Sequence, residues 1–177
     1  MKTVVLTSGP RGAGKSTFVD AYASRSLDVR VLSRDKLLVD LFETTTLDRY
    51  SGGHYLASKL FLEQVEQALH ASEDAKLIVD YWNGFSHDRR SLIREYTHLG
   101  AQKIVCWKFM TPKEVCVDWF MKKEDSAGYT TRMVKNDYDL YHQESQNILS
   151  DGFDQIHYIN PLQLQLPFSL STLSKTY

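Results

Sequence analysis

Short apolar segments alternate with longer amphipathic segments along the chain. The short segments are rich in β-branched or aromatic residues and are bounded by turn residues, which predicts strands. They are Thr3–Thr7, Val29–Leu32, Leu77–Asp80, Lys103–Phe109 and Gln155–Ile159. Two of them contain continuous apolar runs, Leu77–Val79 and Ile104–Trp107, which are typical of strands covered on both faces of a parallel sheet.

Between these segments, hydrophobic residues recur at helical spacing. The predicted helices are Lys15–Ser24, Lys36–Phe42, His54–Ala71, Asp88–Leu99, a helix opened by Thr111 and reaching Lys123, and Thr130–Leu149. Thr111, Pro112 and Glu114 match a capping residue, a proline at the first helical position and a glutamate at the third. Strands alternating with helices predict an α/β fold with a parallel sheet and right-handed crossovers.

Composition narrows the class of protein. The 177 residues carry 21 Lys and Arg against 22 Asp and Glu, a net charge of −1, which fits one ordinary globular domain and excludes disordered or collagen-like chains. Near-neutrality also argues against a broadly basic nucleic-acid coat protein. The pattern predicts one domain over residues 1–160 and a C-terminal tail over 161–177, which contains Pro161 and Pro167.

Targeting and redox signals point to a cytoplasmic protein. No apolar run approaches the ~18 residues that span a bilayer, so no membrane association is expected. The apolar run at the N-terminus is too short for a signal peptide. The two cysteines, Cys106 and Cys116, do not form a disulfide framework or a zinc-binding spacing, and we expect both to be reduced.

One motif carries a specific chemistry. The segment Gly9-Pro10-Arg11-Gly12-Ala13-Gly14-Lys15-Ser16-Thr17, here called the phosphate loop, satisfies G-x-x-x-x-G-K-[ST] in full. It follows a predicted strand and opens a predicted helix, as this motif requires. Its glycines let backbone amides point inward, and the positive end of the helix adds to their attraction for a polyphosphate.

The expected ligand of this loop is ATP with Mg²⁺. Lys15 is expected to bridge the β- and γ-phosphates, Ser16 to supply a hydroxyl to Mg²⁺, and Thr17 to reach the α-phosphate. The full nucleotide-binding set consists of Gly9, Gly12, Ala13, Gly14, Lys15, Ser16 and Thr17.

Two carboxylates follow neighbouring predicted strands. Asp35 stands where the second strand gives way to a helix, beside the phosphate loop, where it can accept a proton from an attacking hydroxyl. The alternative is that Asp35 only caps the helix. Asp80 ends the third strand and is expected to hold Mg²⁺ through a bound water or to orient the acceptor; the alternative is a structural turn.

Other classes of phosphate-loop protein fit less well. The Asn-Lys-x-Asp base-reading motif of GTPases is absent from the sequence, and motor ATPases need a longer chain with sensor elements. A short single domain favours a small phosphotransferase.

The sequence resembles the polynucleotide 5′-kinase group of P-loop phosphotransferases, the kinase domain of phage and bacterial RNA-repair enzymes. The elements that carry the resemblance are Gly9–Thr17, Ser33-Arg34-Asp35, Asp80–Asn83 with Asp88-Arg89-Arg90, and Arg132–Lys135. The resemblance implies transfer of the γ-phosphate of ATP, with Mg²⁺, to a nucleic-acid 5′-hydroxyl. Lys15 and Asp35 would then be catalytic.

With the pattern of elements, this predicts a P-loop NTPase-type three-layer αβα sandwich. Its sheet would have the strand order 2-3-1-4-5, and it would carry a helical lid at Lys122–Gly128 with Arg132 as a transition-state clamp. The lid segment read alone is also compatible with a solvated helix end. The predicted substrate-binding residues are Arg34, Asp35, Asp80, Asn83 and Arg89.

The sequence departs from this family at the acceptor site. Leu38 stands where the family places an arginine that grips the acceptor's phosphate, and Arg34, Arg89 or Arg90 would have to substitute. Tyr81 and Trp82 lengthen the segment after the third strand. Together with the Tyr50–Tyr55 loop they are candidates to stack an acceptor base, although aromatic residues are more commonly part of the core.

The predicted function is therefore a kinase of a nucleic-acid hydroxyl, with the 5′ end of RNA or DNA preferred. The alternatives are a nucleoside or nucleotide kinase, a kinase of a hydroxyl on a modified base in DNA, and a nucleotide-binding regulatory module without turnover.

Overall fold

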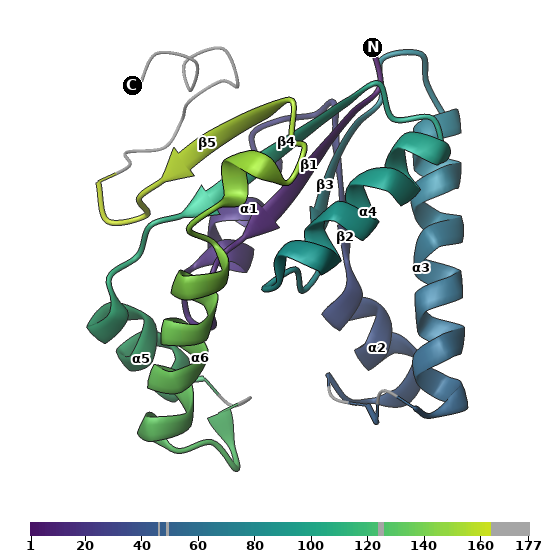
Figure 1. The fold of residues 1–177 in the computed structure, drawn as a ribbon. Coiled ribbons are helices and arrows are strands. Elements are labelled where there is room, and N and C mark those ends of the chain that lie inside the picture. Colours follow the sequence, from purple (N-terminus) through teal and green to yellow (C-terminus); the bar gives the residue numbers. More distant parts are fainter. Residues whose placement is uncertain (46, 49, 124–125, 164–177) are drawn as a thin grey trace.

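The computed structural model describes residues 1–45, 47–48, 50–123 and 126–163. Its centre is a parallel sheet of five strands in the order β2-β3-β1-β4-β5 (Figure 1). The strands are β1 (Thr3–Ser8), β2 (Val29–Ser33), β3 (Lys76–Asp80), β4 (Lys103–Phe109) and β5 (Gln155–Ile159). The predicted fold class and strand order are confirmed, and every predicted strand end lies within one residue of the observed one.

Six α-helices connect or follow the strands. They are α1 (Lys15–Ala23), α2 (Arg34–Phe42), α3 (Gly52–His70), α4 (Ser86–His98), α5 (Lys113–Met121) and α6 (Thr131–Glu144). Each was predicted, with starts that differ by two residues or fewer.

Alternate residues of the strands face two separate cores, which makes the sandwich three-layered. Val4 and Leu6 of β1 point to a core that contains Phe61 and Val65 of α3 and Tyr96 of α4. The intervening residues of the sheet face the second core. Its members from outside the sheet include Phe18, Val19 and Tyr22 of α1 and Cys116 of α5. Burial of apolar surface on both faces is the main stabilising contribution to such a sheet.

The predicted C-terminal end of the last helix and the predicted cap of α5 were wrong. The last helix was expected to reach Leu149, but α6 ends at Glu144 and a short 3₁₀ turn follows at Ile148–Ser150. Lys108 of β4 donates from Nζ to the freed carbonyl of Ser145 at 3.0 Å, which gives the ended helix a partner in the sheet.

The predicted cap of α5 was also wrong. Pro112 occupies the cap position, and α5 begins at Lys113. The Thr111 hydroxyl instead donates to the carbonyl of Ala13 at 2.7 Å, so it supports the phosphate loop rather than its own helix.

Helices α5 and α6 lie next to each other beyond the carboxyl ends of β1 and β4 (Figure 1). Val117 and Phe120 of α5 and Val134 of α6 form a small core between them. At its C-terminal end, α6 is tied to the sheet by a 3.0 Å hydrogen bond between the hydroxyls of Tyr141 and Ser8. The helix pair is therefore positioned over the end of the phosphate-loop strand.

Both cysteines are buried thiols without a disulfide. Loss of hydration raises the pKa of Cys106 to about 12 and that of Cys116 to about 11, so neither is a reactive thiolate at neutral pH.

None of the helices in the described part of the chain combines the length and the hydropathy that a bilayer crossing requires. Of the predicted tail, residues 164–177 lie outside the described residues, and the boundary at residue 160 stays a prediction.

Candidate functional site

The phosphate loop joins β1 to α1 in a conformation that requires glycine. Gly12 and Gly14 have φ angles of 71° and 83°, in the left-handed region that favours glycine. A Cβ on Gly12 would lie 2.0 Å from the carbonyl oxygen of Cys116, so α5 also approaches too closely for any side chain. Gly14 precedes α1 without a side-chain cap, which leaves the first amides of the helix available to an anion.

The ammonium group of Lys15 lies over this loop. Its Nζ donates to the carbonyls of Gly9 at 2.9 Å and Pro10 at 3.0 Å. Burial lowers the pKa of Lys15, and the negative charge of Asp80 opposes this shift. The predicted phosphate-binding side chain therefore occupies the centre of the cradle, close to a carboxylate.

Ser16 and Asp80 bring two oxygen ligands together. The Ser16 hydroxyl donates to Asp80 Oδ2 at 3.0 Å, and the Thr7 hydroxyl holds the other carboxylate oxygen at 2.9 Å. Mg²⁺ prefers oxygen ligands and usually binds through one or two protein groups together with phosphates and waters. The two residues fit that requirement. The described residues contain no cluster of three or more His, Cys, Asp or Glu that would hold a metal ion by itself.

Asp35 stands in the first turn of α2, at the same edge of the sheet. The cap of this helix is Ser33, whose hydroxyl accepts from the amide of Lys36 at 3.4 Å. The capping alternative for Asp35 is therefore wrong. Loss of hydration raises the pKa of Asp35, and the charge of Asp80 raises it further, while Arg34 and Lys15 oppose the shift. A carboxylate with a raised pKa is a stronger base.

Arg34 points from the start of α2 toward α3. Its Nη2 lies 3.0 Å from Nδ1 of His54, and its guanidinium carbon lies 5.4 Å from the ring centroid of Tyr81. Its Nε is buried and has no hydrogen-bond partner among the described residues. Arg34 therefore contacts Tyr81, which directly follows β3, and its substrate-binding role stays a prediction.

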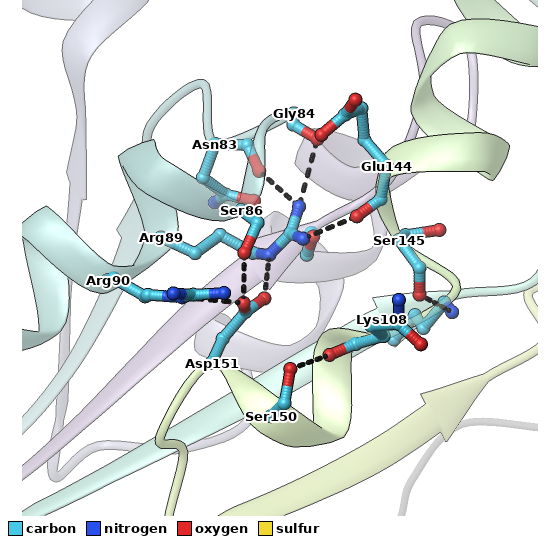
Figure 2. Close-up of polar contacts among 12 residues, drawn as sticks. Asn83, Gly84, Ser86, Arg89, Arg90, Lys108, Glu144, Ser145, Ser150 and Asp151 are labelled. Atoms are coloured by element: carbon cyan, nitrogen blue, oxygen red, sulfur yellow. Dashed lines mark hydrogen bonds and ion pairs between the residues drawn. The ribbon is translucent and has the colours of Figure 1, made fainter.

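Arg89 is not available to a substrate, and this prediction is corrected. Its guanidinium is fully buried and forms an ion pair with Asp151 at 2.6 Å (Figure 2). It also donates to the carbonyls of Asn83, Gly84 and Glu144 at 2.8–3.1 Å. The residue fastens the segment after β3 to the end of α6.

Asn83 also has a structural position rather than an exposed one. The residue is buried, and its side-chain amide donates to the carbonyls of Thr7 at 2.7 Å and Tyr81 at 2.9 Å. Its predicted contact with a substrate is corrected too, because its buried side-chain amide holds the β3–α4 segment to β1 through Thr7 and within itself through Tyr81.

The candidate lid is the α5–α6 pair. Arg132 is exposed in the first turn of α6. Residues 124 and 125 of the predicted Lys122–Gly128 lid segment lie outside the described residues.

Sequence reasoning missed Arg11 of the phosphate loop, which pairs with Asp137 of α6 at 2.9 Å and lies 4.9 Å from the ring centroid of Tyr129. The signal was a charged residue inside the loop, facing an acidic helix.

A cleft of about 690 Å³ opens between α3 and α4. It is lined by residues of both helices and by Tyr81 and Trp82, which directly follow Asp80. The cleft is therefore adjacent to the site of Asp35 and Asp80. Its volume is within the range of small-molecule sites.

Residues 4–144 match a family model described as an AAA domain. The chain belongs to this AAA domain family. Among curated proteins, none matches the sequence.

Solved structures similar to this AAA domain protein show a P-loop kinase fold. A chain of the Pnkp1/Rnl/Hen1 RNA repair complex has a TM-score of 0.69 at 19% identity, over 82% of this chain. This chain spans less than half, 46%, of that one. A putative kinase from Chloroflexus aurantiacus has a TM-score of 0.65 at 13% identity, covering 93% of this chain and 89% of the other. A shikimate kinase from Bacteroides thetaiotaomicron has a TM-score of 0.58 at 16% identity, covering 89% and 87%.

Proposed function

We propose that the protein is an ATP-dependent kinase that transfers the γ-phosphate of ATP to a hydroxyl of a nucleic acid, preferentially the 5′-hydroxyl. One observation carries this proposal. Asp35 lies close enough to Asp80 and Lys15 for their charges to shift its pKa, while Asp80 is hydrogen-bonded to Ser16 of the phosphate loop. The residues that we propose as base, phosphate-binding cation and metal-binding pair thus lie at one edge of the sheet.

Each residue then has a defined part in the reaction. The amides of the phosphate loop and Lys15 hold the phosphates, and Ser16 and Asp80 would hold Mg²⁺, which neutralises charge on the phosphate oxygens. Asp35 accepts the proton of the acceptor hydroxyl. The acceptor oxygen forms a bond to the γ-phosphorus as the bond to the leaving oxygen of ADP breaks. Arg132, in the first turn of α6, would stabilise charge in the transition state.

Support for a nucleic-acid acceptor comes from two sides. A structure that shares this fold belongs to an RNA repair complex, and aromatic side chains line the cleft beside the proposed base. Aromatic faces bind single-stranded bases without sequence preference.

One residue favours a second acceptor class. The polynucleotide kinases place a phosphate-gripping arginine at the position that Leu38 occupies in this chain. Leu38 is uncharged and fully buried. A free nucleoside, or a hydroxyl carried on a base, needs no such cation.

Transfer of labelled γ-phosphate tests the proposal. The acceptors are 5′-hydroxyl RNA, 5′-hydroxyl DNA, duplex DNA bearing hydroxylated bases, and a panel of nucleosides and nucleotides. We expect labelled 5′ ends with the wild type and none with Asp35→Asn. Labelling of free nucleosides or nucleotides alone would replace the acceptor, and ATP binding without transfer to any acceptor would favour a regulatory module.

A further inference from the structure

The cleft between α3 and α4 is unusually rich in aromatic rings. Phe61 lies on α3, Tyr81, Trp82 and Phe85 follow β3, and Tyr96 lies on α4. The rings of Phe61 and Tyr81 pack at 5.3 Å between centroids. Rings that are packed against one another form a rigid surface, and such a surface favours a flat aromatic ligand over a flexible chain.

Trp82 is both exposed and held in place. Its side chain is 45% exposed, although a residue of this size in a tight loop is usually buried. Its ring lies against Gly84, where a Cβ would meet it at 2.3 Å. One part of the indole is therefore fixed by the backbone of the loop, and the exposed part is offered to the cleft.

Tyr96 supplies a polar group that needs a partner. The residue lines the cleft, is fully buried, and has no hydrogen-bond partner for its hydroxyl among the described residues. Leaving a buried hydroxyl without a partner is unfavourable.

The charged residues of the cleft exclude phosphate. Among the described residues that line it, the carboxylates are Asp88 and Glu95, and none is Lys or Arg. The cleft therefore repels a phosphodiester backbone but accepts N–H donors. Partial burial raises the pKa of Glu95, as it would for a carboxylate facing a pocket. Cations lie at the other end, where Arg34 contacts His54 and Tyr81 of the cleft wall.

We infer that this cleft binds a single unstacked nucleobase, that of the nucleotide whose hydroxyl is phosphorylated. The base lies on the rings of Tyr81 and Trp82, and its N–H edge faces Glu95. The sugar hydroxyl then points to Asp35, and the chain's phosphates remain outside. This inference rests on the proposed function, and it adds that the enzyme reads a base rather than the backbone.

The first test measures binding without catalysis. With ADP present, nucleosides are titrated while tryptophan fluorescence is recorded, and ribose serves as the control ligand. We expect saturable quenching by nucleosides, none by ribose, and loss of the signal in Trp82→Phe. Absence of quenching, or quenching that survives in Trp82→Phe, overturns the inference whether or not the protein is a kinase.

The second test compares acceptors. Two 5′-hydroxyl oligonucleotides are used, one with a normal first nucleotide and one whose first position lacks a base. Because stacking of one base contributes about 5-fold to 150-fold in affinity, we expect kcat/KM to fall by at least about 5-fold without it. Equal values would overturn the inference while leaving the kinase proposal intact.

Two variants locate the effect in the cleft. Trp82→Ala and Glu95→Gln are expected to lower kcat/KM for the normal oligonucleotide and to leave the value for the base-free one unchanged. Glu66→Gln, on the exposed side of α3, is the matched control and should alter neither. A folding defect would lower both values together, so equal losses on both acceptors would count against the proposed contact.

Discussion

The hydroxyl of Ser16 donates a hydrogen bond to Asp80, 3.0 Å away, and this contact joins the first turn of α1 to the end of β3. Two segments separated by 64 residues are thereby held so that their oxygens face one another. Thr7 of the intervening strand orients the second carboxylate oxygen. For the cation that we propose they share, this arrangement would be a form of preorganisation.

Removing the hydroxyl tests this pair. Ser16→Ala should raise the Mg²⁺ concentration required for half-maximal phosphoryl transfer by roughly 10-fold or more, because one of the oxygen ligands is lost. The measurement is a magnesium titration at fixed ATP. Ser24→Ala, at the other end of α1, is the control and should titrate like the wild type.

Asp35 gives a prediction in pH. Because its pKa is raised and the carboxylate must be ionised to accept a proton, kcat/KM should increase with pH through a value above the ordinary ~3.9 of aspartate. In Asp35→Asn this dependence should disappear and turnover should drop by about 10²-fold or more, with ATP binding retained. Asp40→Asn, which is exposed on the same helix, should keep both the rate and the profile. Unchanged turnover in Asp35→Asn would remove this residue from its assigned role.

A methyl group at Gly12 should disrupt the phosphate loop. The new Cβ would lie 2.0 Å from the Cys116 carbonyl, and the φ of 71° is strained for any other residue. Gly12→Ala should abolish ATP binding in equilibrium titrations and lower the melting temperature. Gly52→Ala introduces a Cβ with no neighbour within 4 Å and should be neutral. Normal ATP affinity in Gly12→Ala would show that the loop tolerates another conformation.

Arg89 should matter for stability. Its removal takes the buried guanidinium away from the Asp151 carboxylate and from three backbone carbonyls, and breaking a buried ion pair on one side costs about 3–5 kcal/mol. Arg89→Met should lower the free energy of unfolding by this amount in urea titrations, whereas Arg94→Met, exposed on the same helix, should change it by less than about 0.5 kcal/mol. The double variant Arg89→Met with Asp151→Leu should recover part of the loss. A single variant as stable as the wild type would contradict the role of the pair.

Arg132 should affect turnover rather than ATP affinity. As the proposed transition-state clamp, it acts only when charge spreads over the γ-phosphate, so Arg132→Ala should lower kcat by about 10²-fold or more. Steady-state kinetics with KM for ATP measured separately make the distinction. Lys135→Ala, one turn further along α6 and also exposed, is the control. A change confined to KM would assign Arg132 to ATP binding instead.

The parts of this protein that local pattern determines were predictable. The strands are continuous apolar runs covered on both faces, and the phosphate loop needs a fixed spacing of glycines. The juxtaposition of Asp35 and Asp80 was also predictable, because carboxyl ends of parallel strands meet at one edge of a sheet.

Long-range partners were not predictable. Arg89 was predicted to bind the substrate, yet its partner is Asp151, 62 residues later. Thr111 matched a local capping pattern, but its hydroxyl donates to the carbonyl of Ala13, 98 residues earlier. Local rules identify a donor or a charge, while only the assembled sheet decides what it meets.

The bond from Thr111 to Ala13 has a consequence for how the protein matures. The phosphate loop accepts this hydrogen bond from a residue that emerges from the ribosome almost one hundred positions later. Until β4 has joined β1, a nascent chain has the glycines and the lysine but not this brace. A truncated chain that ends before β4 would therefore carry the whole motif but lack the hydrogen bond that Thr111 donates to the loop.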